Sequence, residues 1–276
     1  MEVVFGGISS LLYGVADFFG GEGAKRAPAA SIVFWAGVIS FPLILIVAWA
    51  VGGEASTADF LVGAAAGISG AFGLVSLFAG LSRGHTAAVA PTAAAMAAVL
   101  PVMVAVVGGE RPTTLAWVGV AVALPAIVLS SWVADPGETL RASVGYGLAA
   151  GLGFGGFTAI IRHTDPGSNL LPLITSRAST MLAVLLLTGI GVWRLVGLGS
   201  VPWPMVVANA VLDVTGNVAL LLAVRAGSLA LAAVAASFYP AVTVLLARLV
   251  NAEDLRRRQL FGLGLTLLAM TAISFG

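Results

Sequence analysis

Residues Trp203 to Ala226 read WPMVVANAVLDVTGNVALLLAVRA, an apolar run with one acidic residue, Asp213, near its middle. Asn209 and Asn217 lie four residues before and after this acid. Residues four apart share one face of an α-helix, so the spacing predicts a polar stripe on an otherwise apolar helix. A carboxylate in mid-bilayer is costly and usually faces a bundle interior or a water-filled cavity. The stretch therefore predicts a membrane-spanning helix that carries a working site.

The composition of the whole chain agrees with a lipid environment. Hydrophobic residues make up 59% of the 276 and charged residues 9%, against roughly 45–50% and 25% in soluble domains. The formal net charge of +1 provides no field for nucleic acid, so no nucleic-acid partner is expected. Cysteine is absent, which excludes disulfides and thiolate metal sites. The partner that this composition predicts is the lipid bilayer.

Short polar breaks divide the chain into ten apolar segments, each long enough to cross a membrane. The first is expected to be a retained helix, because Glu2 and no Lys or Arg precede its apolar run. We therefore predict an all-α integral membrane protein with ten transmembrane helices. The segments are 3–21, 28–51, 58–81, 86–107, 113–133, 143–162, 169–193, 203–224, 228–249 and 258–276.

The two halves of the chain resemble each other. A shift of 143 residues places 84–110 on 227–253 without a gap, and Gly84 and Glu110 then match Gly227 and Glu253. An earlier register places 12–17 on 153–158. Each half would hold five spans, residues 1–134 and 143–276. Because five is odd, the second half would enter the membrane upside down, as in many transporters built from two inverted repeats.

These repeats resemble the EamA family of the drug/metabolite transporter superfamily. Each half has a helix that ends in a turn and a glutamate, Gly108-Gly109-Glu110 and Asn251-Ala252-Glu253. The first-helix pattern from Tyr13 to Gly21 is also similar to family members, as is Pro240 thirteen residues before Glu253. The first half departs from this pattern, since Ala97 stands opposite Pro240. The resemblance implies ten helices around a central cavity and alternating access for small organic metabolites.

Three ionisable residues lie well inside the predicted spans: Asp213, Asp17 and Arg177. Asp213 is either a cavity carboxylate that takes up a proton or cation, or a protonated carboxyl that hydrogen-bonds a neighbouring helix. In the first case Asn209 and Asn217 would be its hydrogen-bond partners. Asp17 is either a substrate or proton site or an interfacial carboxylate. Arg177 either extends to the interface or provides the counter-charge for Asp213 or an anionic substrate.

Aromatic residues form a second group of candidates for lining a cavity, although aromatics at helical spacing also serve as packing. Tyr13 and Tyr239 are the two we include in the site, and Tyr239 precedes Pro240, which would free a backbone carbonyl in mid-span. Phe72, Phe154, Trp35 and Phe238 are the others. Glu110 and Glu253 are interpreted as helix-end structure.

Catalytic and cofactor-binding patterns are missing from the sequence. His85 and His163 lie at span ends outside any HExxH motif, and there is no phosphate-binding glycine loop. We expect no cofactor, no metal and no enzymatic activity, so a membrane-embedded enzyme is the least favoured interpretation.

The sequence thus favours a secondary active transporter of small organic metabolites, such as an amino-acid exporter, in the plasma or inner cell membrane, with protons as candidate coupling ions. An uncoupled facilitator or exchanger, with Asp213 purely structural, is the alternative.

Two signals for the orientation of the chain in the membrane conflict. Nine Lys and Arg residues lie in odd-numbered loops and three in even-numbered loops, which predicts both termini outside, whereas the resemblance predicts both in the cytoplasm.

Overall fold

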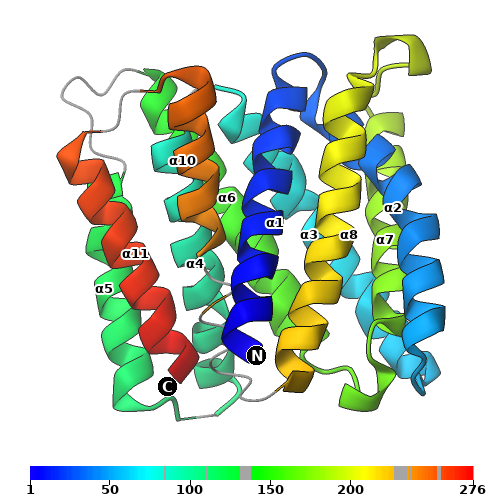
Figure 1. Cartoon of the computed structure of the whole chain (residues 1–276), viewed down its shortest axis with the longest axis horizontal. Helices are drawn as coiled ribbons and strands as arrows, with labels where there is room; N and C mark the ends of the chain where they lie inside the picture. The colour runs from blue at the N-terminus through cyan, green and yellow to red at the C-terminus, as the bar shows by residue number, and fades with distance from the viewer. Residues whose placement is uncertain are drawn as a thin grey trace.

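A computed structural model describes residues 1–83, 85–109, 111–130, 138–226, 235, 238–253 and 256–275. Within these residues the chain forms α-helices and two short 3-10 helices, with no β-strand. Helices are the expected form for apolar segments in lipid, because every backbone N–H and C=O is satisfied within the segment. The helices stand side by side in one bundle (Figure 1).

The bounds of the elements follow the chain in order. They are α1 Glu2–Ala24, α2 Ala29–Val51, α3 Thr57–Leu81, α4 Thr86–Val107, α5 Thr114–Ser130, α6 Glu138–Ile161, η1 Pro166–Ser168, α7 Leu171–Gly189, η2 Leu198–Ser200, α8 Trp203–Ala226, α10 Tyr239–Asn251 and α11 Arg257–Phe275.

Eight of these helices are long and apolar enough to cross a membrane, and α5 and α10 are shorter apolar helices. Most predicted spans agree with a helix to within a few residues. The predicted span 169–193 is too long, because α7 ends at Gly189 and Gly191 takes a positive φ of 78°. Most of the predicted segment before Tyr239 lies outside the described residues.

Pro240 does not bend the middle of a described helix. It occupies the first turn of α10, where a missing N–H costs no intrahelical hydrogen bond. The carbonyl that Pro240 would free belongs to residue 236, which lies outside the described residues, so the freed carbonyl stays a prediction.

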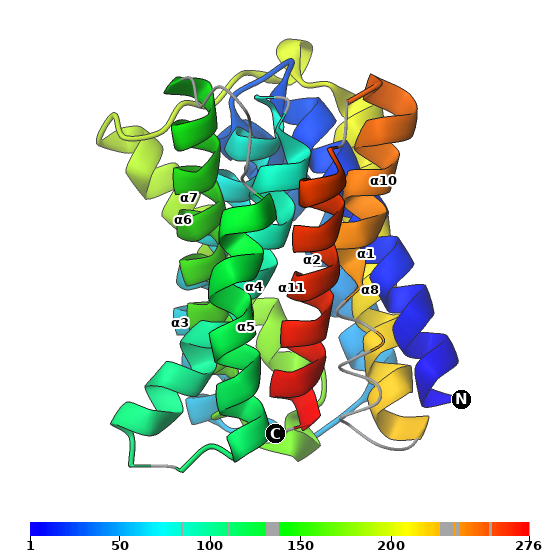
Figure 2. The same cartoon turned by 90° about the vertical axis from the view of Figure 1, so that its left-hand side faces the viewer.

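The bundle has two ends, which we name from α1. At the proximal end α1 begins and α11 ends, so both chain ends lie on the same side of the bundle (Figures 1 and 2). At the distal end α1, α3 and α10 finish, and α2, α4 and α8 begin.

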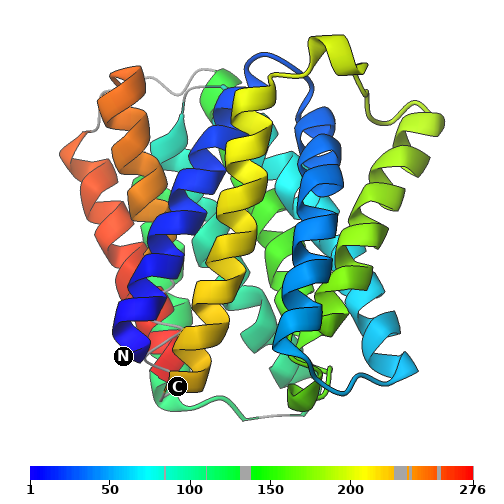
Figure 3. The same ribbon diagram turned by 45° about the vertical axis from the view of Figure 1, so that its right-hand side comes forward.

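Each half of the chain makes the same pattern of helix contacts with the other half. In the first half α1 packs against α8 and α10, whereas in the second half α6 packs against α3 and α4. Helices α2 and α7 contact each other, as do α5 and α11. Figure 3 shows α1 beside α8, and Figure 2 shows α5 beside α11. The same kinds of contact thus recur with the halves interchanged.

Two glycines at related positions of the repeat allow close approaches between these helices. A Cβ on Gly216 of α8 would lie 3.0 Å from the ring of Tyr13 on α1, and a Cβ on Gly73 of α3 would lie 2.7 Å from the ring of Phe154 on α6. Gly73 corresponds to Gly216, and Phe154 to Tyr13, in the two registers of the sequence repeat. Small residues at such positions let helix backbones approach closely in lipid.

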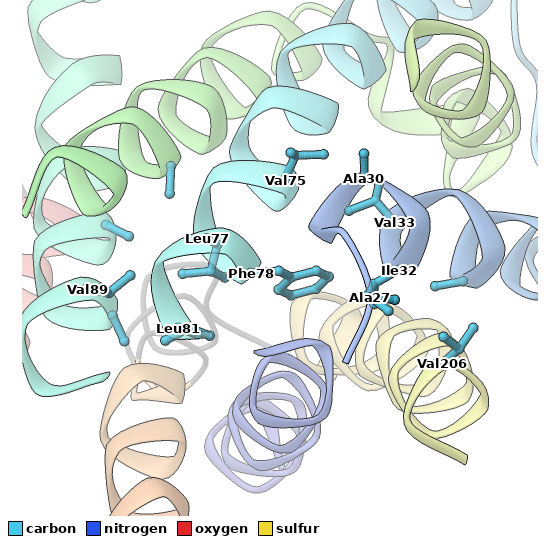
Figure 4. Close-up of a cluster of buried hydrophobic side chains, with 14 of the residues drawn as sticks. Ala27, Ala30, Ile32, Val33, Val75, Leu77, Phe78, Leu81, Val89 and Val206 are labelled. Carbon is cyan, nitrogen blue, oxygen red and sulfur yellow. The ribbon is translucent and has the colours of Figure 1, made fainter. Parts of the chain in front are cut away.

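The main apolar core lies toward the distal end. Figure 4 shows Phe78 extending from α3 toward the beginning of α2, where Ala27 and Ile32 lie. Phe78 is 1% exposed, and its ring packs directly on Gly20 of α1. Leu81 at the end of α3 packs in the same cluster. This packing fills the distal end and leaves space for a cavity nearer the middle of the bundle.

Candidate functional site: a polar cavity between the two halves

A cavity of about 220 Å³ lies among helices from both halves of the chain. Helices α1, α3 and α6 form part of its wall, and α7, α8 and the start of α10 form the rest. Its lining residues are Tyr13, Asp17, Gly70, Leu74, Phe154, Phe157, Leu173, Ser176, Arg177, Thr180, Asp213, Asn217 and Tyr239. Six of the seven predicted site residues are among them, so the structure brings these six together around one space.

The guanidinium of Arg177 forms an ion pair with the carboxylate of Asp213. The side chains are 18% and 23% exposed, respectively. Of the two alternatives for Arg177, the structure therefore favours a counter-charge over extension to the interface. A partly buried charge is stabilised by such a partner, because its desolvation cost is offset by the attraction.

The predicted polar stripe of α8 divides in two. Asn217 donates to the backbone carbonyl of Asp213 at 2.8 Å and approaches its Oδ2 at 3.5 Å. Asn209 is 7% exposed and donates instead to the carbonyl of Ala16 on α1 at 2.8 Å. No hydrogen bond joins Asn209 to Asp213 in the described structure, so the prediction that both asparagines contact the acid is wrong for Asn209. Asn209 lies outside the cavity, on a small void beside it.

Asp17 lines the cavity from α1, about two turns before that helix ends at Ala24. Its carboxylate has no ion-pair or hydrogen-bond partner among the described residues. Asp17, Arg177 and Asp213 also border a second, smaller void of about 20 Å³. The three ionisable side chains therefore share one region of the bundle, and two of them are paired.

Aromatic residues provide much of the remaining wall. Tyr13 and Tyr239 line the cavity as predicted, and so does Phe154. Phe72 instead packs edge-on against Trp193 with ring centroids 5.3 Å apart, and Trp35 packs against Trp203 at 5.7 Å. Phe238 is 42% exposed and does not line the cavity.

Sequence reasoning missed six lining residues: Gly70, Leu74, Phe157, Leu173, Ser176 and Thr180. A signal for three of them was present, because Leu173, Ser176 and Thr180 follow, together with Arg177, the i, i+3, i+4, i+7 spacing of one helix face. This spacing identifies the face of α7 that meets the cavity, once Arg177 is known to point there.

Polar contacts join the two halves at the distal end, beyond the cavity. Glu253, after α10, accepts hydrogen bonds from the backbone N–H of Thr86 at 3.1 Å and from its hydroxyl at 2.9 Å. Asn251 donates to Glu22 of α1 at 2.6 Å. Glu253 thus serves at a helix end, as interpreted from the sequence, whereas Gly84, Glu110 and Gly227 lie outside the described residues.

Within the described residues, an all-helical bundle with eight helices of membrane-spanning length defines a multi-pass membrane protein. The sequence matches the profile of the EamA-like transporter family over residues 1–132 and 141–275. The chain therefore belongs to this family, a family of membrane transporters of small molecules with two repeats per chain. A comparison with curated proteins found no match. Among the described residues, no group of three or more metal-ligating side chains occurs.

Proposed function

We propose that this chain is a secondary active transporter that moves a small organic metabolite through the cavity by alternating access, in the plasma or inner cell membrane. The observation that carries the proposal is the cavity itself. Paired and unpaired charges line a space inside an apolar bundle, where each polar group is costly unless it contacts water or a solute.

We further propose ten spans in two inverted five-helix repeats, residues 1–134 and 143–276. The exchange of helix contacts supports this arrangement, since α1 meets α8 and α10 while α6 meets α3 and α4. The matched approaches of Gly216 to Tyr13 and of Gly73 to Phe154 support it as well. Related contacts between oppositely inserted halves are the expected basis for alternating access.

The distal contacts support a form that is closed at one end. Thr86 with Glu253 and Glu22 with Asn251 join the first half to the second beyond the cavity. Lining residues reach toward the proximal end, because Leu173 lies in the first turn of α7, which begins there. In alternating access the distal contacts would separate while the proximal side closes.

Coupling to protons is part of the proposal, with Asp17 as the acceptor in place of Asp213. Asp213 is held by Arg177, whereas the Asp17 carboxylate lines the cavity without a cation partner among the described residues. The same pairing also favours a second candidate, an uncoupled exchanger, because it removes the first choice of proton acceptor. The two candidates differ in whether a proton gradient drives flux.

Reconstitution into proteoliposomes tests the proposal. The purified chain is reconstituted, a panel of small metabolites is offered, and uptake is followed with and without an imposed pH gradient. Uptake above that of protein-free vesicles supports a transporter, and its loss after the gradient is collapsed supports coupling. Gradient-independent uptake favours the exchanger. A chemically altered product without net uptake would contradict both candidates.

A further inference from the structure

The charges of the ionisable side chains that line the cavity do not sum to zero. Asp17, Arg177 and Asp213 line it, and Arg177 and Asp213 cancel each other as an ion pair. Asp17 remains as one carboxylate without a counter-charge among the described residues. Residues 227–237, which connect α8 to α10, contain no ionisable side chain in the sequence. The fixed charge at the cavity with all three groups ionised is therefore one negative charge.

The rest of the wall suits the body of an organic cation. Tyr13, Tyr239, Phe154 and Phe157 present aromatic surfaces around the carboxylates. The faces of aromatic rings carry partial negative charge and attract ammonium groups. An anion would meet an uncompensated carboxylate, and a zwitterion would have to open the Arg177–Asp213 pair to reach the guanidinium.

We infer that the cavity selects an organic monocation, with its ammonium against Asp17 and its apolar body against the aromatic wall, and that Arg177 sets the accepted charge by cancelling Asp213. This inference rests on the proposed function, because it names the solute class of the same cavity. Arg177 acts as a specificity-determining residue: it contacts Asp213, and through that contact leaves one carboxylate for the solute.

The charge count makes a distinct prediction for a variant of each of the three ionisable residues. Asp17→Asn leaves the paired residues alone and a neutral cavity. Arg177→Gln leaves two unpaired carboxylates and a cavity of two negative charges. Asp213→Asn frees Arg177 to cancel Asp17, so it also produces a neutral cavity although Asp17 is intact. A simple contact between the cation and Asp17 would not predict this last effect.

Binding to the purified full chain in lipid nanodiscs, measured by isothermal titration calorimetry, tests the charge count. The probes are benzylammonium as monocation, 1,4-bis(ammoniomethyl)benzene as dication, phenylalanine as zwitterion and benzoate as anion. Wild type should bind benzylammonium most tightly. Asp17→Asn and Asp213→Asn should each weaken it by about tenfold or more, since a charge in contact is worth at least that factor in a partly buried site. Arg177→Gln should shift the preference to the dication.

Two controls keep the test decisive. Arg177→Lys retains the positive charge and should keep the preference for the monocation, which separates charge from shape. Arg83→Gln changes a cation outside the cavity, one that packs over the ring of Tyr146, and should leave probe affinities unchanged. If Arg177→Gln does not fold, the comparison of Asp213→Asn with wild type still tests the count. Tighter binding of phenylalanine or benzoate to wild type, or an unchanged monocation affinity in Asp17→Asn, would overturn the inference.

Flux measurements separate this inference from the proposed function. Binding of benzylammonium with the predicted charge dependence, but without uptake of any solute above protein-free vesicles, would refute the transporter and leave the charge rule intact. Protein-dependent uptake of phenylalanine or benzoate, with no binding of the monocation, would refute the charge rule and leave the transporter intact.

Discussion

Arg177 on α7 and Asp213 on α8 form an ion pair in the cavity wall, although 36 residues separate them in the sequence. Helix α7 packs against α2 and α3, and α8 packs against α1 and α2. The pair therefore joins two helices that share α2 as a neighbour and otherwise pack against different helices. Its strength affects both the charge of the cavity and the relative position of these helices.

Removal of one member of this pair should destabilise the protein more than removal of both. Arg177→Met leaves the charge of Asp213 without its partner, and Asp213→Asn does the same to Arg177. Each single change should cost about 1–3 kcal/mol, because a partly buried charge loses its charge-assisted hydrogen bond. The double variant should recover part of that loss. A double-mutant cycle on thermal unfolding in detergent measures the coupling. Additive losses would indicate that the two side chains do not interact in the folded protein.

Gly67 should be essential for the packing of α3 on α7. A Cβ at this position would overlap the backbone carbonyl of Ser176 and the hydroxyl of Ser179, and backbone cannot move aside cheaply. Gly67→Ala should therefore cost about 1–3 kcal/mol, as overpacking does. Gly264→Ala on α11, where no atom lies within 4 Å of a new Cβ, should be neutral or stabilising by up to about 1 kcal/mol. Melting temperatures of the two variants check the contrast, and equal behaviour would argue against the close α3–α7 contact.

The fold was largely predictable because hydropathy determines where a chain can span lipid. The predicted span 86–107 coincides with α4, and the span predicted from Trp203 begins where α8 begins. Hydropathy fails where apolar residues continue past a helix. Ile190, Val192 and Trp193 are apolar, but the chain turns at Gly191 with a φ of 78°. It also fails at α6, which begins at Glu138 before the apolar segment starts.

The candidate site was predictable in its residue types and less so in its contacts. The cost of charge in lipid identified Asp213, Asp17 and Arg177, and these do line one cavity. Which helices face each other is decided by packing, so the Arg177–Asp213 pair remained one of two alternatives. The stripe prediction failed at Asn209 because each step of four residues turns the helix about 40° too far. Asn209 and Asn217 are therefore about 80° apart, and one faces α1.

Asn209 should contribute to stability through its bond to α1. Its amide donates to the carbonyl of Ala16 at 2.8 Å in a buried position, so Asn209→Ala should cost about 1–2 kcal/mol. Asn217 donates mainly within its own helix, to the carbonyl of Asp213, and is half-buried, so Asn217→Ala should cost less. Thermal unfolding of the two variants in the same detergent compares them. A larger loss for Asn217→Ala would contradict this assignment of the α1–α8 contact.

The stability of the distal end should depend on pH through Glu253. Burial raises the pKa of this carboxyl, against the opposing effects of its hydrogen bonds from Thr86 and of the nearby Lys25 and His85. A group with a raised folded pKa contributes stability that is fully present below its unfolded pKa, about 4.3 for glutamate, and that is lost as the pH rises through the folded pKa. Wild type should therefore lose stability as the pH rises from the unfolded pKa of Glu253 through its folded pKa.

The variant Glu253→Gln tests this expectation. Its amide keeps an acceptor for the N–H of Thr86 and offers a donor to the Thr86 hydroxyl. The stability of the variant should therefore depend less on pH, and at neutral pH it should exceed that of wild type. Melting temperatures of the two proteins, measured across this pH range, check the difference. An identical pH profile for the two proteins would show that folding does not change the pKa of the Glu253 carboxyl.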